Sequence, residues 1–288
     1  MQRIFYMNTK EYKELLAYEF LWSKENSTLK KMSLTLNNGS LLASEKLKEE
    51  MFFDDAELYE IDNALKERSK AFSVLFKNDE RFPKGLLNVK YPLGMFYYKG
   101  NLDLLKNVCV SVVGSRHVSP KGKIRTEKLI KELHSNTTIV SGLAKGVDTA
   151  ALTTAISLGK KVIGVIGTPI DHYYPKENKE LQDEIATNHL LISQVPLYKY
   201  DKQSFVTKKM YFPERNVVMA AISDATIIVE ASETSGTHSQ AKACFDLGKK
   251  LFILNSCFEN HEITWPTKYL EKGAVRVRAI TDIKILKD

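Results

Sequence analysis

The chain has 288 residues, of which 43% are hydrophobic and 27% are charged, an ordinary balance for a globular protein. This length is sufficient for one large α/β domain and a smaller appendage. No apolar run approaches the roughly 18–20 residues of a membrane-spanning helix, and the first residues lack the apolar core of a secretory signal. Cys109, Cys244 and Cys257 are far apart and in no metal-ligand spacing. We therefore expect a cytoplasmic protein with free thiols, without a metal site and without membrane attachment.

The charge is unevenly distributed along the chain. Residues 1–80 contain 12 Lys and Arg against 15 Asp and Glu, whereas residues 81–288 contain 30 against 20. The net charge of +7 therefore originates in the second part. A basic excess on one domain is typical of nucleic-acid-binding proteins, although a basic solvent-exposed surface alone gives the same count.

Residues 1–78 have the pattern of a small helical module. Apolar residues repeat at helical spacing in residues 11–24, and residues 44–52 and 56–69 have a similar period and charge mix. The sequence NNGS at 37–40 predicts a turn between the first two helices. This part contains no Cys/His cluster, Gly-rich loop or set of catalytic side chains, so we expect a packing or interaction role.

Residues 79–107 predict an extended connector, because each proline disfavours helix at the residue before it. From residue 108 onward, short continuous apolar runs alternate with helical patterns. The expected strands are residues 108–113, 137–141, 161–167, 190–195, 225–230 and 250–254, and the expected helices are residues 121–134, 147–159, 176–187, 213–223 and 235–248. Repeated βα units of this kind predict a Rossmann-like α/β domain at 108–288 with a doubly wound, mostly parallel sheet.

Ligands of such sheets bind beyond the carboxyl ends of the strands. Four segments at these ends are candidate phosphate-binding sites. The first is Gly114, Ser115 and Arg116. Small residues allow main-chain amides to approach an anion, the next helix adds a partial positive charge, and Arg116 can bind a phosphate with two hydrogen bonds. The dinucleotide fingerprint GxGxxG is absent, and Arg116 alone could equally be a surface arginine.

The second segment contains Ser141, Gly142, Lys145, Gly146 and Asp148. The two glycines leave a cradle of main-chain N–H groups, to which the serine and the lysine can add a hydroxyl and a cation. Asp148 can bind first-turn amides or a ligand. A tight turn that uses glycine for positive φ is the structural alternative, but it leaves the serine and the aspartate unexplained.

The third segment is Arg215 and Asn216 at the start of a helix. A cation is unfavourable at the positive end of a helix dipole, so this placement indicates an anionic partner, either Glu230 or a ligand.

The fourth segment is Ser235, Gly236 and Thr237, which open another helix. Hydroxyl groups and a glycine at a helix N-terminus can form a second anion cradle. Capping of the helix would select the same residue types.

In this order, the segments resemble the DNA-processing protein A (DprA/Smf) family. That family has the motifs YPxxL…YxKG, VGSR, SGLAxG[IV]D, YPxxN, FxxRN and SG[ST], with counterparts here at 91–100, 112–116, 141–148, 174–178, 212–216 and 235–237. The resemblance implies a binder of single-stranded DNA without catalytic residues or cofactor. It further implies protection of incoming strands during DNA uptake, help in loading a RecA-type recombinase, and a homodimer, for which the runs near Val229 and Ile253 offer apolar surface.

Some positions depart from the family pattern. Leu152 stands where the family usually has His, Gln194 replaces a Glu, Gln240 replaces a Thr, and Asn255-Ser256 replaces Pro-Gly. These departures indicate a divergent relative and leave its ligand open.

Two alternative functions remain open. A nucleotide-binding sensor or a defence component could use the same phosphate cradle, because a cradle does not distinguish a DNA phosphate from that of a free nucleotide. A phosphoribohydrolase resembling the lonely-guy proteins would need a Glu where Gln240 stands, and an amide cannot act as a general base.

We predict that Arg116, Lys145 and Arg215 surround one basic cleft, because the carboxyl ends of parallel strands share one edge of the sheet. Lys249 and Lys250 are expected at the opposite edge. Aromatic residues near the basic groups can stack on bases, although packing explains each one singly. These residues are Tyr173, Tyr174, Tyr211 and Phe212.

Overall fold

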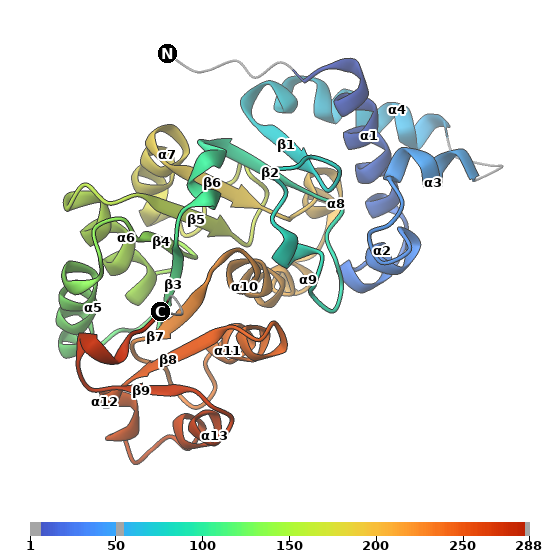
Figure 1. Ribbon diagram of the computed structural model, residues 1–288. Helices are drawn as coiled ribbons and strands as arrows, with labels where there is room; N and C mark the ends of the chain where they lie inside the picture. Colours follow the sequence, from blue (N-terminus) through green and yellow to red (C-terminus); the bar gives the residue numbers. More distant parts are fainter. Residues whose placement is uncertain (1–6, 50–54, 286–288) are drawn as a thin grey trace. The chain divides into compact units, whose positions relative to one another are not determined.

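The structure is a computed structural model that describes residues 7–49 and 55–285 as an α/β fold (Figure 1). The strands are β1 (Ser73–Phe76), β2 (Met95–Gly100), β3 (Cys109–Val113), β4 (Thr138–Ser141), β5 (Val162–Ile166), β6 (Leu190–Ser193), β7 (Ala225–Ile228), β8 (Lys250–Leu254) and β9 (Val275–Val277). The α-helices are α1 (Thr9–Ser23), α2 (Leu29–Thr35), α3 (Ala43–Glu49), α4 (Asp55–Arg68), α5 (Pro120–Glu132), α6 (Val147–Ser157), α7 (Lys179–Asn188), α8 (Leu197–Lys202), α9 (Phe205–Lys208), α10 (Tyr211–Ile222), α11 (Thr237–Asp246), α12 (Asn255–Phe258) and α13 (Trp265–Glu271).

The described strands form a nine-stranded sheet in the order β1-β2-β6-β5-β4-β3-β7-β8-β9. β1 and β2 are antiparallel, whereas β5, β4, β3, β7, β8 and β9 pair in parallel. From β3 the chain proceeds to β4 and β5 on one side, and later to β7, β8 and β9 on the other. The predicted doubly wound, mostly parallel sheet is confirmed, and its strand order reverses between β3 and β7.

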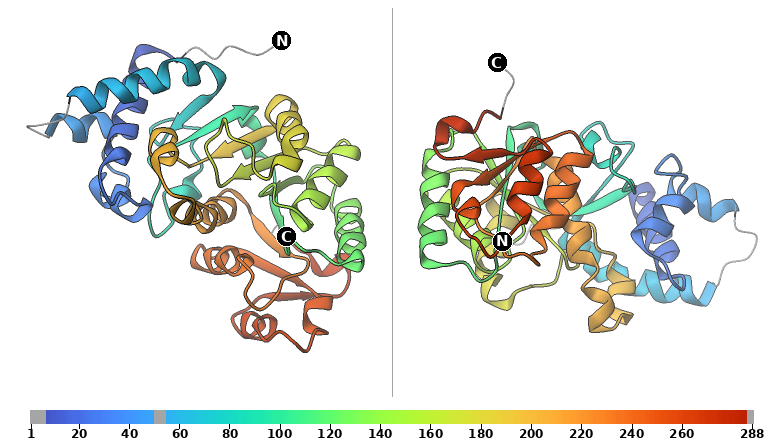
Figure 2. Two further views of the ribbon diagram at one scale, coloured as in Figure 1. Left: turned by 180° about the vertical axis from the view of Figure 1, so that it is seen from behind. Right: turned by 90° about the horizontal axis from the view of Figure 1, so that it is seen from below.

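Helices on both faces explain the continuous apolar strands. All residues of β3, β4, β5 and β7 are buried. α5 and α6 pack side by side, and α11 packs on β7 and β8 at the opposite side of these strands (Figures 1 and 2). α5 begins where the sequence allows it, with Ser119 accepting a hydrogen bond from the Gly122 amide and Pro120 in the first turn.

The chain divides into two compact units. The first contains residues 1–99, 166–172 and 192–214, and the second contains residues 100–165, 173–191 and 215–288. The predicted domain boundaries at 78 and 107 remain predictions, because compactness within one structure does not test which segments fold alone. None of the described helices is both long and apolar enough to cross a membrane.

In the first unit the predicted helices 11–24 and 56–69 are confirmed as α1 and α4. The predicted helix 44–52 corresponds to α3, and its residues 50–52 lie outside the described residues. The prediction of a helical module over residues 1–78 is wrong for residues 73–76, because Val74 and Leu75 are buried in β1. β1 pairs with β2, which lies within the predicted extended connector.

Glu19 of α1 is a buried carboxylate that holds the start of α8. It accepts hydrogen bonds from the main-chain amides of Leu197 at 2.8 Å and Tyr198 at 3.1 Å, and from the hydroxyl of Tyr97. Burial raises the pKa of Glu19, against the effect of these hydrogen bonds. The helical part of the first unit is therefore tied to a segment almost 180 residues later in the chain.

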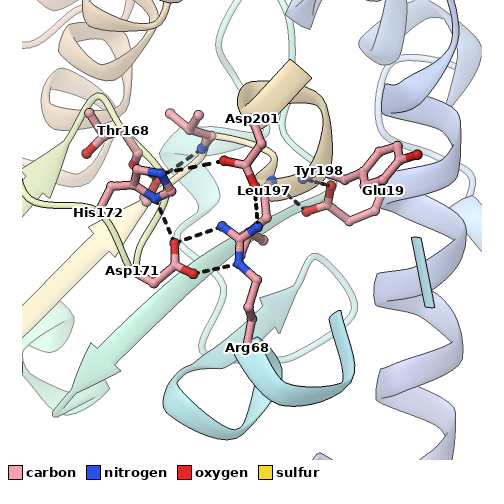
Figure 3. Close-up of polar contacts among 10 residues, drawn as sticks. Glu19, Arg68, Thr168, Asp171, His172, Leu197, Tyr198 and Asp201 are labelled. Atoms are coloured by element: carbon pink, nitrogen blue, oxygen red, sulfur yellow. Dashed lines mark hydrogen bonds and ion pairs between the residues drawn. The ribbon is translucent and has the colours of Figure 1, made fainter. Parts of the chain in front are cut away.

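Arg68, at the end of α4, joins the loop after β5 to α8 within the same unit (Figure 3). Its guanidinium binds both carboxylate oxygens of Asp171, at 2.6 and 3.0 Å, and one oxygen of Asp201 at 2.6 Å. His172 lies between the same two carboxylates. Burial acts to raise the pKa of Asp171, but hydrogen bonds from His172 and Arg68 and the arginine charge outweigh it and hold that pKa well below its usual range.

Candidate nucleic-acid interface

Two predicted segments lie against each other in the second unit. The amide of Val147 donates to the carbonyl of Ser115 at 3.1 Å, which joins the loop after β4 to the loop after β3. Gly146 has φ +80°, and a side chain there would overlap the carbonyls of Ser115 and Arg116. Glycine is thus required at this position both for its backbone conformation and for the close approach of the two loops.

Asp148 shapes the loop after β4 from inside. Its carboxylate is buried and accepts from the amides of Gly142 at 3.1 Å and Ala144 at 3.4 Å. Burial raises the pKa of Asp148, while the charge of Arg215 acts to lower it. Ser141 is also buried and donates to the carbonyl of Val112 at 2.7 Å. Two of the amides expected to cradle a ligand are therefore occupied by the chain itself.

Arg215 differs from its prediction. The residue is only 5% exposed, and its guanidinium donates to the carbonyls of Gly142 and Val165, the latter at 3.0 Å. Burial lowers its pKa to about 10, while Asp148 acts to raise it. Its acceptors are neutral carbonyl oxygens at the ends of β4 and β5, and the nearby anion is the carboxylate of Asp148 rather than the predicted Glu230 or a ligand. The expectation that Arg215 lines an open cleft does not fit this geometry.

Glu230 occupies the start of α5, where the sequence indicated a phosphate. Its carboxylate accepts from the amide of Ser119 at 2.9 Å and from the hydroxyl of Ser119 at 2.7 Å. Its carbonyl accepts from the amide of Ser115 at 2.6 Å. A carboxylate is stabilised at the positive end of a helix dipole, so the chain supplies its own anion at this position.

Arg116 and Lys145 are the predicted cations that are exposed. The ammonium group of Lys145 binds the carboxylate of Glu177 at 2.6 Å. The next residue, Asn178, is buried and donates to the carbonyl of Leu143 and to the hydroxyl of Thr149, both at 2.8 Å. The YPxxN segment is thereby attached to the loop that carries Lys145.

The predicted aromatic residues divide into two groups. Tyr173 and Tyr174 are exposed, and Tyr173 donates to Asp183 at 2.6 Å with the ammonium of Lys179 5.2 Å from its ring. Tyr211 is buried, so the prediction that it stacks on a base does not fit its position. Phe212 is half-buried in the first unit, where its ring packs against Gly167.

The side chain of Asn216 holds the fourth segment through hydrogen bonds. Its side-chain amide donates to the carbonyl of Gly236 at 3.0 Å and to the hydroxyl of Ser239 at 2.8 Å. The hydroxyls of Ser235 and Thr237 lie 2.7 Å apart, and the Thr237 amide donates to Ser235. Gly236 is exposed and has open space where a side chain would project. The Ser235 hydroxyl thus binds the first amide of α11, and Gly236 is the most exposed residue of the three.

Comparison with known proteins assigns the family. The sequence profile of the family described as DNA recombination-mediator protein A matches residues 73–286. The chain belongs to this family. The resemblance inferred from the ordered motifs is thereby confirmed.

Individual members of the family align over most of this sequence. The DNA processing protein DprA of Streptococcus pneumoniae is 41% identical over 184 residues, which cover 64% of this chain and 62% of that protein. The match thus spans less than two thirds of the pneumococcal protein. The Bacillus subtilis protein is 28% identical over 218 residues, covering 75% of this chain and 71% of that protein.

Two solved structures of family members share the fold. The X-ray structure of the pneumococcal DNA processing protein A gives a TM-score of 0.75 at 30% identity, over 93% of this chain and 96% of that one. The Helicobacter pylori protein, whose structure concerns its single-stranded DNA binding mode, gives 0.62 at 32% identity, over 73% and 93%.

Gln240, which departs from the family pattern, is fully buried. Oriented so that its nitrogen donates to the carbonyl of Asn216 at 2.6 Å, its amide also lies within hydrogen-bonding distance of Ser111 and Thr226. Gln240 therefore joins α10 and α11 to the sheet and faces no solvent. Among residues 7–49 and 55–285, no group of three His, Cys, Asp or Glu side chains could hold a metal ion.

Three residues named from the sequence have structural roles that were not predicted. Val229 and Ile253 are buried within the sheet, so they do not supply the apolar dimer surface expected of them. Lys249 and Lys250 lie at the start of β8, as predicted, but the ammonium of Lys249 caps the C-terminus of α10 by donating to the carbonyls of Ala220 at 2.9 Å and Ala221 at 2.6 Å. No local sequence signal indicates this cap, because Lys249 follows α11 and lies 28 residues after Ala221 in the sequence.

Proposed function

We propose that this protein binds single-stranded DNA through Arg116 and Lys145, with Tyr173 and Tyr174 as stacking surfaces. The observation that carries the proposal is that two exposed cations lie on two loops in direct main-chain contact, beyond the ends of β3 and β4. The structure of the H. pylori relative concerns its single-stranded DNA binding mode, which supports the choice of ligand. Phosphates would bind the cations, and exposed tyrosine rings can stack on any base.

Binding of labelled single-stranded and double-stranded oligonucleotides over a range of salt concentrations tests this function. Each phosphate contact contributes about −0.7 to the slope of log K against log salt for single strands. Arg116→Ala and Lys145→Ala should each flatten the slope by about that amount. The control is Lys161→Ala, an exposed lysine before β5 at the opposite end of the strand. An equal loss of affinity in the control would show that the positive charge of the whole surface binds DNA. It would contradict an interface at Arg116 and Lys145.

We further propose that binding is not coupled to catalysis. The position at which a phosphoribohydrolase would need its glutamate is the buried Gln240. Release of free base from nucleoside monophosphates by the purified protein, above a buffer control, would contradict this.

A homodimer and cooperation with a RecA-type recombinase during DNA uptake are proposals that rest on family membership. Light scattering at tens of micromolar tests the first, with a monomer as the contradicting result. Recombinase filament formation on protein-coated single strands tests the second, with an unchanged rate of formation as the contradicting result. We also propose cytoplasmic localisation, which fractionation of cells would test.

A further inference from the structure

The loop at 142–146, which carries Lys145, contains a residue in a strained conformation. Leu143 has φ +54°, in the left-handed region that bulky side chains rarely adopt. Its side chain is fully buried and lies so close to Gly164 of β5 that a side-chain carbon there would overlap it. Such a conformation persists only where the surroundings enforce it, and it is most common at binding and active sites. The groups that hold Leu143 therefore also determine how Lys145 is presented.

Three side chains bind the main chain around Leu143. Asp148 accepts from the amides of the residues before and after it, and Arg215 donates to the carbonyl of the residue before it. Asn178 donates to the carbonyl of Leu143 itself, at 2.8 Å. Asp148 belongs to the helix that directly follows the loop, whereas Asn178 lies 35 residues beyond Leu143. The YPxxN segment thus contributes a direct hold on the strained residue.

Thr149 extends this hold to the next residue of the loop. The side-chain amide of Asn178 also donates to the hydroxyl of Thr149 at 2.8 Å, and this hydroxyl donates to the carbonyl of Ala144 at 2.7 Å. Asn178 is only 8% exposed, so its removal would leave the carbonyl of Leu143 without its donor in a poorly solvated position. Asn178 therefore fixes the two residues that directly precede Lys145.

The residue before Asn178 contacts the side chain of Lys145. The carboxylate of Glu177 binds the Lys145 ammonium at 2.6 Å, and both side chains are more than half exposed. An exposed ion pair of this kind is weak, so a phosphate can take the place of the carboxylate. The hydrogen bonds of Asn178 are buried and can persist when that exchange occurs.

We propose that Asn178 is a positioning residue for single-stranded DNA binding and that it acts through Lys145. The proposal rests on the proposed function, in which Lys145 binds a phosphate. Asn178 does not contact the DNA; it fixes the main chain from which the Lys145 side chain extends. A loop that is ordered before binding loses less conformational freedom when the complex forms, and the affinity is correspondingly higher.

A double-mutant cycle with a labelled single-stranded oligonucleotide tests this role. Asn178→Ala should weaken binding about threefold, but less than about 1.5-fold when Lys145 is already alanine. The slope of log K against log salt should also become flatter in Asn178→Ala, towards the slope of Lys145→Ala. All proteins of the cycle carry Glu177→Gln, so that a displaced Glu177 carboxylate cannot offset the loss.

Two further sets of variants separate positioning from loss of stability. Thr149→Ser keeps the hydroxyl that links Asn178 to the loop and should bind DNA more tightly than Thr149→Val, which lacks it. The matched control is Asn216→Ala, because Asn216 is also a buried asparagine whose amide donates to one carbonyl and one hydroxyl. Any effect of Asn216→Ala on DNA affinity should be the same with and without Lys145.

Hydrogen exchange in the absence of DNA measures the hold on the loop separately. The amides of Ala144 and Thr149 are hydrogen-bonded within this loop, and they should exchange about tenfold faster in Asn178→Ala than in the wild type. Unchanged exchange would show that Asn178 does not hold the loop and would overturn the proposal.

The outcomes of the cycle distinguish the two proposals. A loss of DNA affinity in Asn178→Ala that is equal with and without Lys145 would give Asn178 a general structural role, which overturns the positioning role and leaves the proposed function intact. Wild-type affinity of Lys145→Ala would contradict the proposed function, and the positioning role with it. Thermal unfolding curves verify that each variant is folded, and the Thr149 pair decides the question if Asn178→Ala is not.

Discussion

The guanidinium of Arg215 lies directly against Gly142, so that a side-chain carbon at Gly142 would overlap the Nη1 atom of the arginine. The same nitrogen donates to the Gly142 carbonyl. The glycine that the sequence suggested for a phosphate cradle is therefore needed for the packing of a buried arginine. Asp148 binds the Gly142 amide, which places the loop between a buried cation and a buried anion.

Arg215→Ala should lower the free energy of unfolding by about 3–5 kcal/mol, because it leaves the buried Asp148 without its compensating charge. Urea unfolding in the absence of DNA measures this. The double variant Arg215→Ala with Asp148→Asn should recover part of the loss. Arg116→Ala, which removes an exposed cation of the proposed DNA interface, should change the stability by less than about 0.5 kcal/mol. Wild-type stability of Arg215→Ala would assign the arginine to the surface instead.

The sequence was sufficient to place the loops but not to orient their side chains. Arg116, Lys145 and Asp148 follow strands whose carboxyl ends share one edge, so their proximity follows from the parallel sheet. Whether Arg215 faces solvent depends on how α10 packs against β4 and β5. Local sequence patterns carry no information on this packing. β1 was missed for a related reason, since four residues carry too little periodicity and depend on pairing with β2.

Glu177→Gln should strengthen binding of single-stranded DNA about 1.5- to 5-fold, the scale of one exposed ion pair. The carboxylate of Glu177 binds the ammonium group of Lys145, and this contact lowers the pKa of Glu177. The carboxylate therefore competes with a phosphate for the ammonium group. Fluorescence anisotropy at low salt measures the gain. Glu180→Gln, a nearby exposed carboxylate, is the matched control, and an equal gain there would indicate a general charge effect.

Lys249→Met should lower the free energy of unfolding by about 1–3 kcal/mol, because the carbonyls at the end of α10 lose their donor. Burial lowers the pKa of Lys249, while Asp224 acts to raise it. Thermal unfolding measures the loss, with Lys161→Met as an exposed control. DNA affinity of the folded variant should equal that of the wild type, and a reduced affinity would place Lys249 in the interface.

Arg68→Gln should lower the free energy of unfolding by about 2 kcal/mol at neutral pH. In the acid range, the free energy of unfolding of this variant should change less with pH than that of the wild type. The folded-state pKa of Asp171 lies below its unfolded value. The stability that it contributes is therefore present above about pH 4 and is lost as the pH falls through the folded pKa. Chemical denaturation between pH 5 and pH 2 measures the slope. An unchanged acid slope in Arg68→Gln would show that the arginine does not hold the aspartate charged.

Glu214 should affect the pH dependence of the free energy of unfolding in the opposite direction to Asp171. It lies in the first turn of α10, and burial raises its pKa from 4.5 to about 7, against a hydrogen bond from the Leu29 amide. Between those two values the folded chain retains a proton that the unfolded chain has released, so stability should fall as the pH rises through this window. The shift corresponds to about 3 kcal/mol at most.

Glu214→Gln keeps an acceptor for Leu29 but removes the charge, and should be more stable than the wild type above pH 7 and close to it below pH 5. His189 contributes with the opposite sign near pH 6, because burial lowers its pKa, and its contribution is common to both proteins. The difference in urea midpoint between variant and wild type at pH 5, 6, 7 and 8 therefore isolates Glu214. A constant difference over this range would show that Glu214 is ionised throughout and that the raised pKa is wrong.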